Sequence, residues 1–267
     1  MLRVLNDIDH QSITPNASPS NNHKILVALL TAAFCLLFVH YLKYNVVFND
    51  VLSGISSLIK GNPKLLAWQI RSHTYGQLYS QAWWGLIHLF GFMLIPCACI
   101  KWVFNEKIAD YGLQAGDVRS HLKWYLFLTA PILCFAVIVS FRADFSSKYP
   151  FYNLAFRSWS DLILWEIIYV IQFISLEFFF RGFMLRSTQH VFGSNAILVM
   201  CLPYTMLHFQ KPWLEATGAI AFGLFLGVLA MRSRSIWGGV GVHVSIALTM
   251  DFAALIQTRG LPQQLLP

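Results

Sequence analysis

The stretch DLILWEIIYVIQFISLEFFFRGFML, residues 161–185, decides the fold. Apolar side chains fill most of it, and it contains few ionisable residues. About 20 apolar residues at a rise of about 1.5 Å each are enough for a helix to cross a bilayer. The stretch therefore predicts a helix that spans a membrane.

Similar apolar runs lie on both sides of this stretch. With it included they number seven: 25–43, 82–103, 122–141, 160–186, 196–210, 215–231 and 236–256. An eighth is left open in 44–81, where VLSGISSLI is too short to span and fits a re-entrant or interfacial piece. The sequence predicts an all-α, polytopic integral membrane helix bundle.

The composition supports a membrane protein and argues against nucleic-acid binding. The chain is 57% hydrophobic and 12% charged, with a mean hydropathy of +0.56, which is too apolar for a soluble domain of this length. The 19 Lys and Arg residues lie singly between apolar runs and form no basic stripe. Aromatic residues at the ends of several runs, such as Trp124 and Tyr125, are expected to be interfacial anchors. The five cysteines lie in or beside apolar runs, so we expect neither a disulfide framework nor a zinc ribbon.

Small residues predict where helices approach closely. Ala219, Gly223 and Gly227 recur at every fourth position, which gives 215–231 a flat stripe for packing. Gly238, Gly239 and Gly241 form a second group just before His243, where the backbone can approach a neighbour.

The polar residues of the last apolar runs are the candidates for chemistry, because ionisable groups at membrane depth are costly and mark functional sites. Glu177 and Arg181 are four residues apart, which is an ion-pair spacing, and this pair could also be purely structural. His208 follows Tyr204 by four residues in LPYTMLHF.

His243 and Asp251 lie eight residues apart on one face of the last run. A carboxylate and two imidazoles from three helices can activate water and support a developing oxyanion. Glu177, His208 and His243 would also suit zinc as a ligand set, so a divalent zinc ion remains an alternative.

The run LEFFFRGFML, followed by YTMLHF and GGVGVH, resembles the CPBP family of intramembrane proteases, which includes the CAAX prenyl proteases and bacteriocin-processing or self-immunity relatives. The resemblance covers roughly 160–251. Its motifs match Glu177 and Arg181, then Tyr204 and His208, then His243. It implies a hydrolase in which a glutamate and the first histidine activate water and the last histidine supports the oxyanion.

Two positions depart from the family pattern. Leu176 stands where the family has the first of two adjacent glutamates, the one usually credited with base chemistry. Ala247 stands where it has an asparagine, and losing one oxyanion donor costs about 10²–10³ in rate, so Ala247 alone does not exclude activity. Asp251, one turn later, is a candidate replacement. Either Glu177 serves alone as the base, or the chain is a catalytically silent relative that scaffolds other membrane proteins. A transporter is disfavoured, since we find no internal repeat.

These interpretations predict an organisation and a setting. We expect a flexible polar tail at 1–24, N-terminal transmembrane helices and loops at 25–159, CPBP-like catalytic helices at 160–256 and a short tail at 257–267. The expected partners are the lipid bilayer and a membrane-anchored protein or peptide substrate, and the expected location is a bacterial plasma membrane, which the chain crosses several times.

Overall fold

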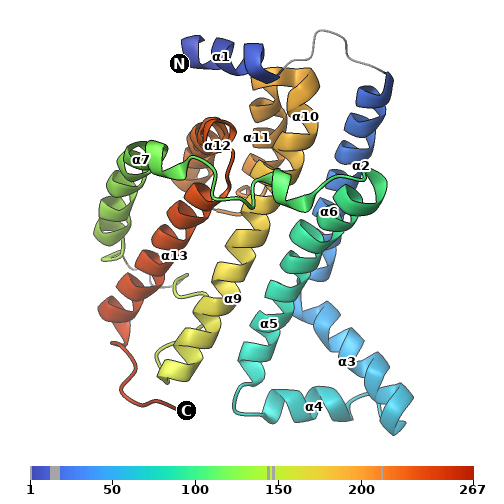
Figure 1. Ribbon diagram of the computed structural model, residues 1–267. Helices are drawn as coiled ribbons and strands as arrows, with labels where there is room; N and C mark the ends of the chain where they lie inside the picture. The colour runs from blue at the N-terminus through green and yellow to red at the C-terminus, as the bar shows by residue number, and fades with distance from the viewer. Residues whose placement is uncertain (1, 13–18, 143–144, 146–147, 212) are drawn as a thin grey trace. The chain divides into compact units, whose positions relative to one another are not determined.

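The computed structural model describes residues 2–12, 19–142, 145, 148–211 and 213–267. Every regular element in these residues is a helix (Figure 1). The chain divides into two compact units, and the division points fall within helices. The first unit comprises Met1–Leu36, Phe92–Leu126 and Ser175–Gly241. The second comprises Leu37–Gly91, Phe127–Ile174 and Val242–Pro267.

The first half of the chain is built from long helices and short connecting ones. In chain order they are α1 (Leu2–Ser12), α2 (Pro19–Leu42), α3 (Asn45–Lys60), α4 (Leu65–Ser72), α5 (Gly76–Leu89), the π-helix η1 (Phe90–Leu94), α6 (Ile95–Ala98), the π-helix η2 (Cys99–Val103), the 3₁₀ turn η3 (Ile108–Tyr111) and α7 (Val118–Val139).

The C-terminal part carries the candidate residues. It contains α9 (Trp159–Glu177), the π-helix η4 (Phe178–Met184), α10 (Leu185–Phe192), the 3₁₀ turn η5 (Gly193–Asn195), α11 (Ala196–Met206), α12 (Trp213–Ser233) and α13 (Trp237–Thr258).

The expected polytopic all-α membrane protein is confirmed. In the described part of the chain, six helical runs are long and apolar enough to cross a bilayer: Asn22–Leu42, Gly76–Val103, Val118–Val139, Trp159–Met206, Glu215–Ser233 and Trp237–Thr258. The number is below seven because the expected spans 160–186 and 196–210 lie in one continuous run. Its last piece, α11, has 11 residues, or about 16 Å of helix, and is too short to span alone.

Two regions outside the spans are helical. Asn45–Ile59 forms an apolar helix shorter than a span, as expected for this part of the chain. We expected residues 1–24 to be a loose tail. In the structure, α1 covers Leu2–Ser12 and α2 begins at Pro19, while residues 13–18 lie outside the described part. Tertiary contacts explain α1: Asp9 Oδ1 accepts a hydrogen bond from the Ser194 amide at 2.6 Å, and Ile8 is buried.

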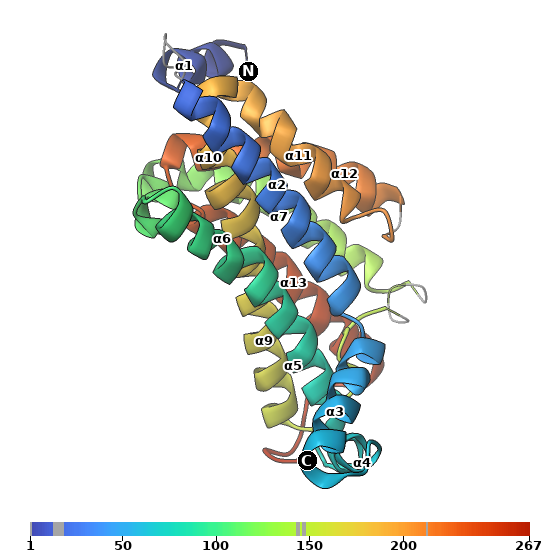
Figure 2. The same cartoon turned by 90° about the vertical axis from the view of Figure 1, so that its right-hand side faces the viewer.

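Close helix packing organises the first unit. Helices α11 and α12 lie side by side (Figure 2). A Cβ at Gly223 would meet the Cys201 sulfur, and one at Gly227 would meet Ile197. The small-residue stripe therefore packs as the sequence predicted, and it fixes α11, the helix that leads to His208.

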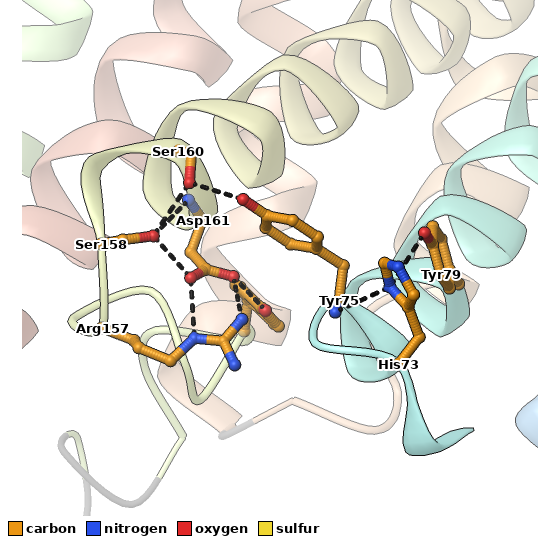
Figure 3. Close-up of polar contacts among 8 residues, drawn as sticks. His73, Tyr75, Tyr79, Arg157, Ser158, Ser160 and Asp161 are labelled. Atoms are coloured by element: carbon orange, nitrogen blue, oxygen red, sulfur yellow. Dashed lines mark hydrogen bonds and ion pairs between the residues drawn. The ribbon is translucent and has the colours of Figure 1, made fainter. Parts of the chain in front are cut away.

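In the second unit, a polar network fixes the start of α9. Ser158 caps the helix, because its hydroxyl accepts from the Asp161 amide at 3.1 Å. The same hydroxyl donates to the Asp161 carboxylate at 2.7 Å. The buried Asp161 also accepts from two Arg157 nitrogens at 2.8 Å (Figure 3). The Tyr152 hydroxyl donates to the same carboxylate at 2.7 Å. Burial raises the pKa of Tyr152, and its hydrogen bond to Asp161 raises that pKa further.

The C-terminal tail completes this anchor. The carbonyls of Gln264 and Leu265 accept from the Trp159 and Ser160 amides, each at 3.0 Å. These amides belong to the first turn of α9, where backbone N–H groups have no acceptor within the helix. The side chain of Ser160 shares a 2.9 Å hydrogen bond with Tyr75 (Figure 3).

Candidate active site

Glu177 and Arg181 form a buried ion pair in the first unit. Glu177 is the last residue of α9, and Arg181 lies within η4. Arg181 Nη1 donates to Glu177 Oε1 at 2.9 Å, and both side chains are 0% exposed. The ion-pair spacing in the sequence is therefore confirmed. Two charges away from water need each other's compensation, so this contact fixes the orientation of the carboxylate.

The π-helical turn η4 follows Glu177 directly. Its seven residues are all buried, and Phe179 stacks on Phe92 with ring centroids 4.7 Å apart. A Cβ at Gly182 would meet the Tyr111 carbonyl. Single π-turns inside helices occur frequently at functional sites. This turn was not predictable from the sequence, since the pattern of apolar residues in FFFRGFM is also compatible with an α-helix.

Tyr204 connects the ion pair to His208. The Arg181 guanidinium lies 4.3 Å from the centroid of the buried Tyr204 ring, which is a cation–π contact. The Tyr204 carbonyl lies 3.0 Å from His208 Nδ1, and the two rings are 4.9 Å apart. Because a carbonyl oxygen only accepts, Nδ1 is the protonated nitrogen and Nε2 of the neutral ring is the acceptor. His208 lies in the turn after α11 and is partly buried.

Two glycines at the start of α13 lie close to Glu177 and Tyr125. A Cβ at Gly239 would overlap Oε2 of Glu177, and a Cβ at Gly238 would overlap the ring of Tyr125. The close approach expected for these glycines is therefore present. Because Gly239 has no side chain, its backbone can lie directly beside Oε2 of Glu177.

Tyr125 lies in the interior and not at an interface. We expected an interfacial anchor, but Tyr125 is 4% exposed and shares a 3.3 Å hydrogen bond with Ser233. The charges of Glu177 and Arg181 both act on its hydroxyl. Aromatic residues at run ends suggest an interface, and no feature of the sequence distinguished this one from its exposed neighbour Trp124.

His243 and Asp251 belong to the second unit. The His243 ring stacks on Phe173 at 5.4 Å and 19°. Asp251 is fully buried and accepts a 2.7 Å hydrogen bond from Trp165 Nε1. Asp251 therefore links α13 to α9 through its hydrogen bond with Trp165.

Both positions that depart from the family pattern are buried. Leu176 is 8% exposed and Ala247 is 5% exposed. Ala247 packs in an apolar cluster with Trp165 and Tyr169. A side chain there meets aromatic rings, which explains why alanine is compatible with the packing.

The described residues contain no set of side chains that could bind zinc. Among the residues that the structure describes, no group of three or more His, Cys, Asp or Glu side chains could hold a metal ion. We derive no catalytic step through a metal.

Residues 158–249 match the family described as type II CAAX prenyl endopeptidase Rce1-like. This confirms the resemblance drawn from the three motifs, and the family is one of intramembrane proteases. The matched segment begins one residue before α9 and ends within α13, so it contains every candidate except Asp251. No match was found among curated proteins or among solved structures.

Proposed function

We propose that this chain is an intramembrane endopeptidase that hydrolyses a peptide bond of a membrane-anchored or membrane-adjacent protein or peptide. In this proposal Glu177 is the general base and His208 positions the attacking water. His243 donates to the oxyanion, the role that the family resemblance implies for it.

The buried carboxylate of Glu177 is the observation that carries the proposal. Arg181 engages Oε1 and sets the plane of the carboxylate. Oε2 faces Gly239, where only a glycine leaves room. A general base must lie within hydrogen-bond reach of the water that it deprotonates. We therefore assign Oε2 as the atom that takes the proton.

His208 supports this assignment through its tautomer. With Nδ1 donating to the Tyr204 carbonyl, Nε2 accepts a hydrogen bond and can orient a water molecule. The water oxygen then attacks the carbonyl carbon, while its proton passes to Glu177. The same proton moves to the leaving nitrogen as the C–N bond breaks, while the second proton of the water stays on the attacking oxygen, which yields a carboxylic acid product and an amine product.

A cleavage assay tests the proposal. Tagged membrane-anchored peptides are co-expressed with the wild type and with Glu177→Gln, His208→Ala and His243→Ala, at equal membrane levels. Glu166→Gln is the matched control, because Glu166 is a glutamate of the same helix outside the proposed site. We expect cleavage by the wild type and the control and its loss in the three variants. Cleavage that survives Glu177→Gln would exclude the assigned base.

A silent relative that scaffolds membrane proteins is the second candidate, favoured by the apolar surroundings of Ala247. In that case the wild type cuts no peptide, whereas the double variant Leu176→Glu and Ala247→Asn gains activity. Binding of a partner would then be unchanged in Glu177→Gln.

A further inference from the structure

A basic cavity lies in the first unit, apart from Glu177 and His208. Its volume is about 400 Å³, and Arg186, Arg232 and Arg234 line it together with Asp110 and His190. Its walls come from α1, η3, α10 and the end of α12. Nothing in the proposed peptidase reaction uses these residues.

Arg186 is only partly satisfied by the protein. Its Nη2 donates to the Ala230 carbonyl at 3.1 Å. Its Nε is buried and has no hydrogen-bond partner in the described part of the chain. A buried donor without an acceptor is costly, so the protein leaves part of the Arg186 guanidinium uncompensated. Because Arg186 lines the cavity, an anion in the cavity would offset its positive charge.

Arg234 is held at the cavity by a strained backbone. Its φ is +54°, in the left-handed region that residues other than glycine rarely adopt. Two hydrogen bonds hold the connection around it: Ile236 N to Gly112 O at 2.9 Å, and Asp117 N to Ser233 O at 2.8 Å. Strain that the surrounding structure maintains is characteristic of ligand-binding sites.

The charges of the cavity favour an anion. Asp7 pairs with Arg232 at 3.2 Å. The remaining arginines, Arg186 and Arg234, repel each other electrostatically. Asp110 brings one opposing carboxylate to the lining, and Gln114 donates to it at 3.1 Å. The net charge of the lining is therefore positive, and an anion between Arg186 and Arg234 would relieve their repulsion.

The position of the cavity identifies the class of anion. It lies where spanning helices end, since Glu215–Ser233 finishes beside it and Gly76–Val103 finishes shortly before η3. Lipid phosphates are found at this level, and basic pockets at helix ends bind anionic headgroups. Guanidinium groups match the oxygens of a phosphate with paired hydrogen bonds. We propose that this cavity binds a phosphate group, which an anionic phospholipid supplies through its headgroup.

The test uses the purified full-length chain in detergent. Its melting temperature is measured against increasing phosphatidylglycerol, phosphatidylcholine, inorganic phosphate and a short peptide with a free carboxylate. The variants are Arg186→Gln, Arg234→Gln and Asp110→Asn. Arg119→Gln is the matched control, because Arg119 is an exposed arginine of the same unit that does not line the cavity. Arg186→Lys keeps the charge of Arg186 if the glutamine variant fails to fold.

We expect phosphatidylglycerol to raise the melting temperature of the wild type and of Arg119→Gln, with phosphatidylcholine giving little effect. Loss of one charge-assisted contact should weaken the apparent affinity about tenfold or more in Arg186→Gln and Arg234→Gln. Asp110→Asn should strengthen it.

Stabilisation by inorganic phosphate equal to that by the lipid would support the phosphate site with a soluble source. Equal lipid stabilisation of the wild type and both arginine variants would overturn the proposal. Stabilisation by the peptide with a free carboxylate, and by none of the phosphate-containing ligands, would also overturn the proposal. None of these outcomes depends on cleavage, so the site can fail or stand independently of the peptidase.

Discussion

Gly239 lies so close to Glu177 that a Cβ at residue 239 would overlap the carboxylate oxygen Oε2. The other oxygen of the carboxylate is held by Arg181 at 2.9 Å. The carboxylate is therefore fixed from both sides, by a cation on one and by bare backbone on the other. In the proposed reaction this fixes the direction in which Glu177 can take a proton.

Gly239→Ala should remove most of the peptidase activity while leaving the chain folded. The new methyl group must displace the Glu177 carboxylate, and a displacement of about 1 Å at a reacting group can cost about 10²-fold in rate. Cleavage of a tagged membrane-anchored peptide measures the effect. Gly241→Ala is the control, since a Cβ at Gly241 meets nothing within 4 Å. Equal activity of the two variants would mean that the position of Oε2 does not matter for cleavage.

Arg181→Met should destabilise the protein strongly. It leaves the buried Glu177 without its cation, and breaking one partner of a buried ion pair costs about 3–5 kcal/mol. The double variant Glu177→Leu and Arg181→Met removes both charges, so it should recover much of this loss. The free energy of unfolding in detergent, measured for both variants and the wild type, checks this. A double variant less stable than the single one would show that packing around Arg181 dominates.

The sequence was sufficient to predict the helical class, most of the spans and the ion pair, because each follows from local spacing. The same holds for Gly223 and Gly227, whose four-residue period implies a packed face. The sequence did not predict that 160–186 and 196–210 lie in one continuous run. The π-turn after Glu177 and the burial of Tyr125 were not predictable in this way. Both depend on which side chains other helices bring against them, and that information is not local.

The pair Lys24 and Glu106 should make stability depend on pH. Lys24 Nζ lies 2.7 Å from Glu106 Oε1, and the Tyr111 hydroxyl donates to Oε2 at 2.5 Å. Burial raises the pKa of Glu106, but the hydrogen bonds from Lys24 and Tyr111 outweigh it and leave the pKa below its ordinary value of 4.5. A lowered folded-state pKa means that this stabilisation is present above about pH 4.5 and is lost as pH falls below it.

We expect the wild type to exceed Glu106→Gln in melting temperature near neutral pH and the difference to shrink below about pH 4.5. The carboxylate is 40% exposed, so the contribution should be under about 1 kcal/mol. Thermal unfolding of both proteins over this pH range measures it. A difference that stays constant with pH would show that the ion pair contributes nothing.

Trp165→Phe should destabilise the second unit by more than the loss of indole volume requires. Trp165 Nε1 donates to the fully buried Asp251 at 2.7 Å, and removing a donor from a buried carboxylate costs about 1–3 kcal/mol or more. Trp84→Phe is the matched control, because Trp84 packs against the same cluster at 6.1 Å from Trp165. Adding Asp251→Asn to Trp165→Phe should recover part of the loss, since an amide bears no charge that needs the donor. If Trp84→Phe and Trp165→Phe lower the free energy of unfolding equally, the hydrogen bond to Asp251 adds nothing to stability, and the two tryptophans act only through their packing.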